Sequence, residues 1–357
     1  MLMLLWILHQ NTKFRKDLML LNIIGNMIKN IEPYYSTTNS CVENLQTSIC
    51  KMLNRDFRNM YAYSWNFGYD QAAELLADRI KTSRDRQRRN CEEEYALEML
   101  CGIKTIWHIK SDRQRFEKIV KKEIDAGRPV AVGIDIYSCY WHKFYHKYHF
   151  LHFCLIIGID EKGFICIDDT LENKDEINIL VAKDSIIHIS YKQYQENCNC
   201  FITFQFKDKT EKIEEERIVY WAALKTLLGY QEKSDFDYMR LLKKDIVESF
   251  DISKEVNDEH EPRAIPIIRS FACISWSRKN YVSFLSNLKT KMINPTIIEN
   301  INESSKLWMG ISNYILMYMV KNKKGFDYIQ LENVLQKIIE LEEKTAYYIV
   351  EEFEKRC

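Results

Sequence analysis

The sequence predicts an α+β protein with a helical C-terminal region, and three changes of pattern along the chain support this prediction. Apolar residues recur at helical spacing over residues 41–57, β-branched and aromatic runs dominate residues 128–206, and helical spacing returns after about residue 212. A run of strands followed by a run of helices is typical of α+β proteins. We therefore expect an N-terminal helix packed on an antiparallel sheet, followed by a helical region.

The first predicted helix begins directly after the turn-rich polar segment 33–40. In CVENLQTSICKMLNRDF, residues 41–57, apolar side chains fall at helical spacing, and Cys50 is expected to be a packing residue of this helix. A second helix is predicted over residues 111–127. Gly127 is its expected C-terminal stop, because glycine readily takes the backbone conformation that ends helices.

Three strand-like segments follow in close succession. They are RPVAVGIDIY (128–137), HFCLIIGID (152–160) and FICIDDT (164–170), and strand-like sequence continues to about residue 206. The turn DEKG between the second and third segments predicts a hairpin. Because its two strands have similar lengths, the end of the third segment should return close to the start of the second.

A charged run at residues 207–215 separates the strand-rich part of the chain from the helix-rich part. With 357 residues, the chain is long enough for two domains. We therefore expect one domain over residues 1–206 and a helical domain over residues 207–357.

Charge and cysteine usage restrict the classes of function. Lys and Arg together number 51, as do Asp and Glu, so the net charge is zero and a broad basic surface for nucleic acid is disfavoured. Residues 79–90 form only a local basic segment. The eleven cysteines show neither a disulfide framework nor zinc spacing, which indicates a reducing, cytoplasmic location. The apolar segment 1–10 is too short to span a bilayer and lacks signal-peptide features, so no membrane partner is expected.

Cys41 stands where the polar loop ends and the first predicted helix begins. A thiol attacks as the thiolate, and a helix N-terminus or a nearby imidazolium lowers the pKa of a cysteine. Ser40 or Asn39 is a suitable N-cap, and N–H groups of the first turn could stabilise a developing oxyanion. Cys41 is therefore the candidate nucleophile, with a small core residue as the alternative.

Four of the eight histidines fall within WHKFYHKYHFLHF, namely His142, His146, His149 and His152. A metal site is one interpretation, but the spacing matches no recognised frame, and we expect no metal. His152 stands at the head of a buried strand, from which its side chain could project into a cleft. We take His152 as the candidate base and expect the other three to be exposed or half-buried loop residues.

A catalytic histidine needs a partner that fixes its tautomer. The predicted hairpin brings the end of its second strand beside His152, and Asp168 and Asp169 stand at that end. Alternation along a strand puts the two aspartates on opposite faces, and both faces are apolar, so strand parity does not choose between them. Asp160 belongs to the turn and lies too far along the hairpin to be the partner.

Aromatic residues supply candidate pocket walls at two places. In SWNFGYD, residues 64–70, they alternate around a glycine that would let an extended substrate approach the backbone, and a packed loop is the alternative. The aromatic loop 137–150 is a candidate for excluding water from a site. The candidate pocket residues are Trp65, Phe67, Gly68, Tyr69, Tyr140 and Trp141.

Taken together, these segments resemble a known family. CVENL, YSWNFGYD, GRPVAVGIDIYSCYWH and HFLHFCLIIGIDEKGFICIDDT are similar, in this order, to the N-terminal domain of butirosin biosynthesis protein H. The last segment also resembles the bacteriocin-processing cysteine peptidase domain of peptide exporters. Both families have a papain-like cysteine-protease fold. The resemblance, which spans roughly residues 35–206, therefore implies a papain-like catalytic domain, and the helical remainder resembles the region that often follows it.

Relatives of butirosin protein H transfer an acyl group from a carrier-protein thioester, through a cysteine, to an amine, and one in closthioamide biosynthesis forms amides. Carried over by position, the resemblance implies Cys41 as nucleophile, His152 as base and Asp168 as orienting acid, with Asp169 as the alternative acid. The glutamine expected upstream of the cysteine is replaced by Tyr35. The candidates for the oxyanion hole are therefore Tyr35, backbone N–H groups and Asn39.

We therefore expect a cysteine-dependent, amide-forming acyltransferase of antibiotic biosynthesis that uses no cofactor. Its expected partners are an acyl or peptidyl carrier protein as thioester donor and a small amine as acceptor. A cysteine peptidase or amidohydrolase with the same triad, and a non-catalytic papain-fold binding protein, are the alternatives. The helical region is rich in Tyr, Trp and Met and could form a homodimer face or a carrier-protein dock, or simply its own core.

Overall fold

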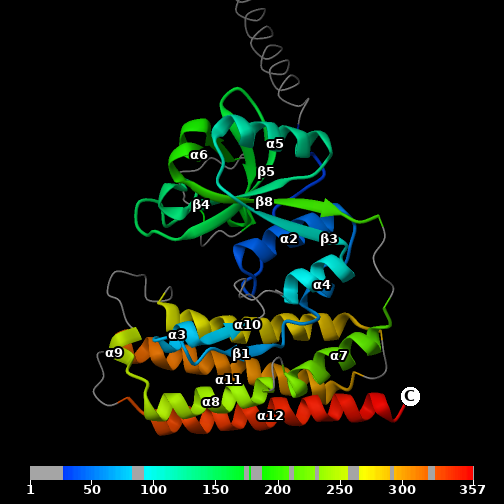
Figure 1. Cartoon of the computed structure of the whole chain (residues 1–357), viewed down its shortest axis with the longest axis vertical. Coiled ribbons are helices and arrows are strands. Elements are labelled where there is room, and N and C mark those ends of the chain that lie inside the picture. Colours follow the sequence, from blue (N-terminus) through cyan, green and yellow to red (C-terminus); the bar gives the residue numbers. More distant parts are fainter. Residues whose placement is uncertain are drawn as a thin grey trace, which may run out of the picture. The chain divides into compact units, whose positions relative to one another are not determined.

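The computed structural model describes residues 27–82, 92–172, 177, 187–208, 213–229, 233–255, 265–289, 293–320 and 326–356. This described part forms two compact units, and Figure 1 labels many of their helices and strands. The first unit comprises residues 27–36, 40–55 and 105–206, and the second comprises residues 37–39, 56–104 and 207–356. The apolar segment 1–10 and most of the basic segment 79–90 lie outside the described residues.

The described part of the first unit contains a six-stranded sheet with the strand order β3-β8-β4-β5-β6-β7. Neighbouring strands from β8 to β7 pair in antiparallel fashion. The bounds are Ile103–Ile109 (β3), Val130–Asp135 (β4), Leu151–Ile159 (β5), Gly163–Ile167 (β6), Ile187–Ser190 (β7) and Cys198–Phe206 (β8). The antiparallel sheet predicted from the sequence is confirmed.

β5 and β6 form the predicted hairpin, which brings the residues after β6 close to the start of β5. The turn is held by Asp160, whose Oδ1 accepts hydrogen bonds from the N–H groups of Lys162 at 2.8 Å and Gly163 at 3.0 Å. Gly163 has a φ of +150°, and a Cβ at this position would overlap the carbonyl oxygen of Ile189. Glycine is therefore required at the start of β6.

The helix α2, Cys41–Met52, begins at a capping box. Ser40 Oγ accepts a hydrogen bond from the N–H of Glu43 at 3.3 Å, and Glu43 Oε2 accepts one from the N–H of Ser40 at 2.6 Å. The apolar side of α2 packs against β5, and the helix also contacts the short 3-10 helix η4, Asp169–Glu172. Cys50 is fully buried, as expected for a packing residue.

Two further helices cover the sheet of the first unit, α5 at Arg113–Asp125 and α6 at Tyr191–Asn197, and the 3-10 helix η3, Ile136–Ser138, follows β4. The ring of Phe116 on α5 packs against those of Phe164, Tyr194 and Phe201, with centroid distances of 5.1, 4.1 and 4.9 Å. Gly127 takes a φ of +70° just after α5, which confirms the predicted helix stop.

The second unit is mainly helical, and the predicted C-terminal helical region is confirmed. In Figure 1 the long helices α8, α10, α11 and α12 run side by side, and α7 packs on α12. The helix bounds are Glu215–Leu228 (α7), Asp235–Glu248 (α8), Ile252–Glu255 (α9), Pro266–Asn287 (α10), Pro295–Val320 (α11) and Tyr328–Glu354 (α12). None of the helices in the described part is long and apolar enough to cross a membrane.

Residues 56–104 pack within the second unit, whereas we expected them in a continuous domain over residues 1–206. They form the 3-10 helix η2 (Phe57–Tyr61), the helices α3 (Leu76–Arg79) and α4 (Glu92–Leu100), and a separate two-stranded sheet of β1 (Phe67–Tyr69) and β2 (Ile80–Thr82). The structure therefore divides the chain at four places before residue 206, as well as at the charged run after it.

A buried ion pair holds this segment against the long helices of the second unit. The side chains of Arg278 and Glu342 are fully buried, with Arg278 Nη2 2.9 Å from Glu342 Oε2. The carboxylate also accepts hydrogen bonds from Trp65 Nε1 at 2.8 Å and Trp308 Nε1 at 3.2 Å, and Arg278 Nη1 donates to the carbonyl oxygen of Asn66 at 3.1 Å. Trp65 and Glu342 are 277 positions apart, so local sequence pattern could not reveal this contact.

Candidate active site

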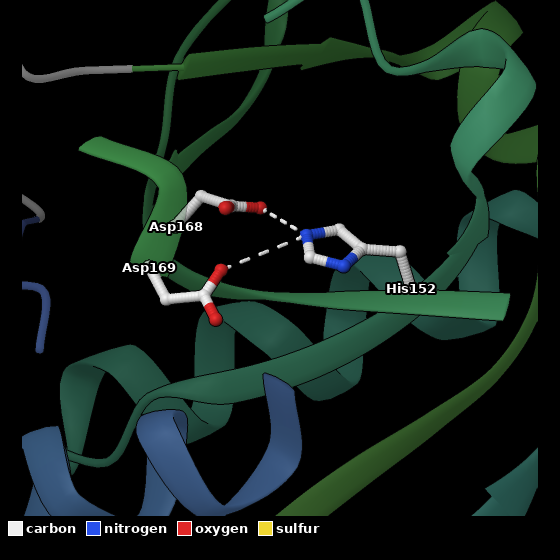
Figure 2. A group of neighbouring side chains, drawn as sticks. All are labelled: His152, Asp168 and Asp169. Carbon is white, nitrogen blue, oxygen red and sulfur yellow. Dashed lines mark hydrogen bonds and ion pairs between the residues drawn. The ribbon is translucent and has the colours of Figure 1, made fainter. Parts of the chain in front are cut away.

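His152 and Asp168 form a buried pair in the first unit, shown in Figure 2. His152 is the second residue of β5 and Asp168 directly follows β6, so the hairpin brings the two side chains together. His152 Nε2 lies 2.7 Å from Asp168 Oδ2, and the side chains are only 7% and 0% exposed. The interaction between them is strong because water hardly screens it.

Asp168 accepts several further hydrogen bonds. Its Oδ2 accepts one from Trp141 Nε1 at 3.0 Å, and its Oδ1 accepts from the N–H and hydroxyl groups of Thr170 at 2.9 and 2.8 Å. Burial alone would raise the pKa of Asp168, but the charge of His152, the hydrogen bonds with His152 and Asp169, and the one from the N–H of Thr170 hold this pKa well below its usual range. Asp168 is therefore ionised.

The pKa of His152 is raised well above its ordinary value. Burial opposes the charged imidazolium, but the charge of Asp168 and the hydrogen bond to it outweigh that effect. A side-chain hydrogen bond with Cys41 raises the pKa further. Because Asp168 occupies Nε2, the nitrogen left for the thiol is Nδ1.

Cys41 is a half-buried thiol at the first position of α2. The capping box formed by Ser40 and Glu43 sets where the helix begins, so it also sets where this thiol stands. The positive end of the helix dipole lies at the same place and favours negative charge there. The structure thus brings Cys41, His152 and Asp168 together from a helix start and two neighbouring strands.

Asp169 is also buried, but its environment differs from that of Asp168. Its Oδ1 lies 4.0 Å from His152 Nε2, and its Oδ2 accepts a hydrogen bond from Asn44 Nδ2 at 2.7 Å. Burial and the neighbouring charge of Asp168 raise the pKa of Asp169 well above its usual range. Asp168, rather than Asp169, therefore makes the short, ionised contact with the imidazole.

Among the described residues, His152, Asp168 and Asp169 are the one group of three potential metal ligands whose donor atoms lie within 4.8 Å of one another. Both oxygens of Asp168 already accept hydrogen bonds from Trp141 and Thr170. These donors would compete with a cation for the same lone pairs. We therefore interpret the group as a hydrogen-bonded set and assign no metal to it.

Two residues of the segment 140–150, Trp141 and His142, lie beside the His152–Asp168 pair. Trp141 is buried and donates to Asp168, whereas the hydroxyl of Tyr140 accepts a hydrogen bond from the N–H of His188 on β7 at 3.2 Å. A tryptophan N–H that fixes the orienting acid was not anticipated. The sequence places Trp141 only in an aromatic loop, so no local signal distinguished this role from that of a pocket wall.

Of the other three histidines of the loop, His142 lies next to the imidazole of His152, with ring centroids 5.5 Å apart. His146 and His149 are exposed, as expected, and His149 Nδ1 lies 2.7 Å from Asp135 Oδ2. His142 departs from the expectation, because it is buried and its Nδ1 accepts a hydrogen bond from the N–H of Phe144 at 3.1 Å. Buried in this way, His142 stabilises the loop.

The aromatic residues of SWNFGYD lie in the interior of the second unit, in agreement with the packed-loop alternative. Trp65 and Phe67 are buried, and the ring of Trp65 stacks on that of Tyr281 at a centroid distance of 5.3 Å. Gly68 pairs within β1, and the hydroxyl of Tyr69 donates to Asp245 Oδ2 at 2.7 Å. The prediction that Trp65, Phe67, Gly68 and Tyr69 line a substrate pocket is therefore replaced by core packing.

Of the two side chains predicted for an oxyanion hole, Tyr35 is half-buried in the segment before α2. Asn39 is grouped with the second unit, where its Oδ1 accepts hydrogen bonds from the hydroxyl of Tyr61 at 2.8 Å and from Asn280 Nδ2 at 3.2 Å. The oxyanion-hole role of Tyr35 and Asn39 stays a prediction.

The positions of Thr170 and Asn44 in the sequence carry a signal for their place in the site. Thr170 stands two positions after Asp168, the spacing at which an aspartate accepts the N–H of an Asx turn. This spacing would have favoured Asp168 over Asp169. Asn44 follows Cys41 by three positions, so the two share one side of α2.

The fold and these side chains define a class: an α+β protein that holds a cysteine, a histidine and an aspartate together at a helix start and an antiparallel hairpin. Residues 61–170 match the family model described as butirosin biosynthesis protein H, N-terminal. The resemblance predicted from the sequence is thereby confirmed over a range that includes His152, Asp168 and Asp169 and begins after Cys41. No curated protein matches the chain.

Proposed function

We propose that this protein is a papain-like, cysteine-dependent acyltransferase that forms an amide bond in antibiotic biosynthesis. The observation that carries the proposal is the buried His152–Asp168 pair, 2.7 Å apart, with Cys41 hydrogen-bonded to the same imidazole. The ionised Asp168 favours the imidazolium form of His152. The positive charge of that imidazolium in turn favours the thiolate of Cys41. The family match supports a role in biosynthesis.

In the first half of the proposed reaction, the thiolate of Cys41 attacks the carbonyl carbon of an acyl thioester. A bond forms between the Cys41 sulfur and the acyl carbon, and the bond between that carbon and the donor sulfur breaks. The imidazolium of His152 gives its proton to the departing sulfur, so the donor leaves as a thiol. Backbone N–H groups at the start of α2 are suited to stabilise the oxyanion that forms on the way.

In the second half, an amine attacks the acyl carbon of the Cys41 thioester. Neutral His152 accepts a proton from the attacking nitrogen, the new C–N bond forms, and the bond between the acyl carbon and Cys41 breaks. The thiolate and imidazolium are restored together. Asp168 stays ionised throughout, and its contact with Nε2 keeps Nδ1 directed toward the reacting atoms.

We propose an acyl or peptidyl carrier protein as the donor and a small amine as the acceptor. A thioester already has a good leaving group, so the chemical demand on the enzyme lies mainly in orienting the amine and excluding water. Trp141, fully buried beside Asp168, keeps water from one side of the pair.

The proposal is tested by intact-protein mass spectrometry after incubation with an N-acetylcysteamine acyl thioester. We expect the wild type to gain one acyl group and Cys41→Ala to gain none. Cys273→Ala is the matched control, because Cys273 is also a half-buried thiol but lies on α10 of the second unit. It should be acylated like the wild type.

Equal labelling of the wild type and Cys41→Ala would refute the proposal. Adding small amines to the acylated protein then separates the remaining alternatives. Release of an amide supports the transferase, whereas release of only the free acid assigns the same residues to a cysteine hydrolase. Absence of any adduct on the wild type would favour a non-catalytic binding protein.

A further inference from the structure

Asn44 connects three separate parts of the first unit through a buried side chain. Its Oδ1 accepts a hydrogen bond from the N–H of Ser36 at 3.1 Å, in the segment before α2. This contact fixes the orientation of the amide, because only the oxygen can accept from an N–H group. Nδ2 must then face Asp169, and it donates to Oδ2 at 2.7 Å. The helix that carries Cys41 is thus tied directly to the residue next to Asp168.

The contacts of Asp169 distinguish its two oxygens. Oδ2 accepts the hydrogen bond from Asn44, the role that a carbonyl oxygen fills. No N–H or O–H group of the described residues donates to Oδ1, although this atom is buried. A carboxylate would leave that oxygen without a donor and would place a second negative charge beside Asp168, an arrangement that a buried site disfavours.

The charged groups that face Asp169 come from every element packed around it. His152 belongs to β5, Asp168 follows β6, and Cys41 begins α2. The carboxyl groups of Asp168 and Asp169 are neighbours, with one oxygen of each within 4.8 Å of the other. In Figure 2 one oxygen of Asp169 is directed toward the imidazole, beside the contact made by Asp168.

We propose that Asn44 and a protonated Asp169 form a positioning pair that holds the Cys41 helix against the His152–Asp168 contact. Oδ1 of Asp169 donates its proton toward Asp168, and Oδ2 accepts from Asn44, so one neutral acid links the nucleophile's helix to the orienting acid. Neither residue touches the substrate. This inference rests on the proposed function, because it assigns Cys41 as the nucleophile.

The decisive variant is Asp169→Asn, since an amide reproduces the shape of the protonated acid. Its oxygen can accept from Asn44 and its NH2 group can donate toward Asp168. Asp169→Ala and Asn44→Ala each remove the link. Ser48→Ala is the matched control on α2, because the buried Ser48 hydroxyl has no hydrogen-bond partner among the described residues.

The measurement is the rate of Cys41 alkylation by iodoacetamide as a function of pH, followed by peptide mass spectrometry. We expect Asp169→Asn and Ser48→Ala to alkylate within about twofold of the wild type. Asp169→Ala and Asn44→Ala should be slower by about tenfold, the effect of losing one buried hydrogen bond. The pH of half-maximal rate should also rise in these two variants toward about 8.5, the ordinary pKa of cysteine.

Two results would overturn the inference. If Asp169→Asn is as slow as Asp169→Ala, the site needs an ionised carboxylate at this position, and Asp169 is the orienting acid. If Asn44→Ala reacts like the wild type, the link does not position the thiol. Should Asp169→Ala fail to fold, the comparison of Asn44→Ala with Asp169→Asn decides the question by itself.

The alkylation assay uses no acyl donor, so it can fail or succeed independently of the proposed reaction. If the alkylation rates follow the expected pattern but no thioester acylates the protein, the positioning pair is supported and acyl transfer is rejected. A protein that is acylated on Cys41 but shows no effect of the Asn44 and Asp169 substitutions would retain acyl transfer and reject the pair.

Discussion

Replacing Asp168 by asparagine removes a charge while keeping the size of the side chain. Both oxygens of Asp168 act only as acceptors, from His152 and Trp141 on one side and from Thr170 on the other. An amide offers a single acceptor oxygen, so its NH2 group must face one of these sides. In either orientation at least one buried N–H group loses its acceptor.

The magnitude of the effect follows from burial. Breaking a buried ion pair by removing one partner lowers the free energy of unfolding by about 3–5 kcal/mol, and this range already includes the unpaired donor. We expect a loss in this range for Asp168→Asn. The matched control is Asp135→Asn, because His149 Nδ1 lies at the same 2.7 Å from Asp135 Oδ2 but the two side chains are 68% and 29% exposed. An exposed pair contributes only about 0–1 kcal/mol.

The pH dependence of this loss has a defined sign. The pKa of Asp168 is lower in the folded than in the unfolded state. Its contribution to the free energy of unfolding is therefore fully present above the unfolded-state pKa and disappears as pH falls through the folded-state pKa. The pKa of His152 is higher in the folded than in the unfolded state. Its contribution to the free energy of unfolding is therefore fully present below the unfolded-state pKa and disappears as pH rises through the folded-state pKa. The difference in the free energy of unfolding between wild type and Asp168→Asn should therefore be largest between about pH 4 and pH 6.5.

Urea unfolding followed by tryptophan fluorescence measures both variants, at a pH inside this window and again at a pH near 2. The reasoning is refuted if Asp168→Asn and Asp135→Asn lose the same free energy inside the window. It is also refuted if the loss in Asp168→Asn is as large at the acid end as in the window.

Two further pairs of substitutions, each a test with its control, examine the buried ion pair of the helical unit and the glycine of the hairpin. Glu342→Gln leaves Arg278 buried without its counter-charge and should lower the free energy of unfolding of the helical unit by about 3–5 kcal/mol. Glu343→Gln, whose partner is largely exposed, should change it by about 0–1 kcal/mol, and equal urea midpoints for the two variants would contradict the argument. Gly163→Ala should destabilise the hairpin by about 1–3 kcal/mol, because its Cβ would overlap backbone at a positive φ. Gly310→Ala, which meets nothing within 4 Å on α11, should instead stabilise by about 0.5–1 kcal/mol, and thermal melting that ranks the two glycine variants in the opposite order would contradict this.

The hairpin of β5 and β6 shows why part of the site could be predicted from sequence. Its turn residues and its two strands lie within 20 positions, so pairing is a local consequence of strand length and turn chemistry. His152 and the two aspartates therefore had to be neighbours. The choice between the aspartates was not accessible from strand alternation, because β6 ends at Ile167 and Asp169 already belongs to η4.

The placement of residues 56–104 could not be predicted from the sequence. Their aromatic residues have the pattern of a pocket wall as much as that of a core, and only contacts with distant helices distinguish the two. Trp65 donates to Glu342, and Phe67 donates its N–H to Asp235 at 2.8 Å. Such contacts depend on how helices pack, which no short window of sequence encodes.

The sequence by itself determined the elements of this protein: a helix that starts at Cys41, an antiparallel hairpin that joins His152 to the acidic pair, and a helical C-terminal region. These follow from capping, turn chemistry and periodicity, which act over a few residues. Only the tertiary structure decided that Asp168 takes the imidazole and that Asp169 faces Asn44. That decision depends on burial and on charges from separate elements, because a carboxyl group ionises or keeps its proton according to everything packed around it.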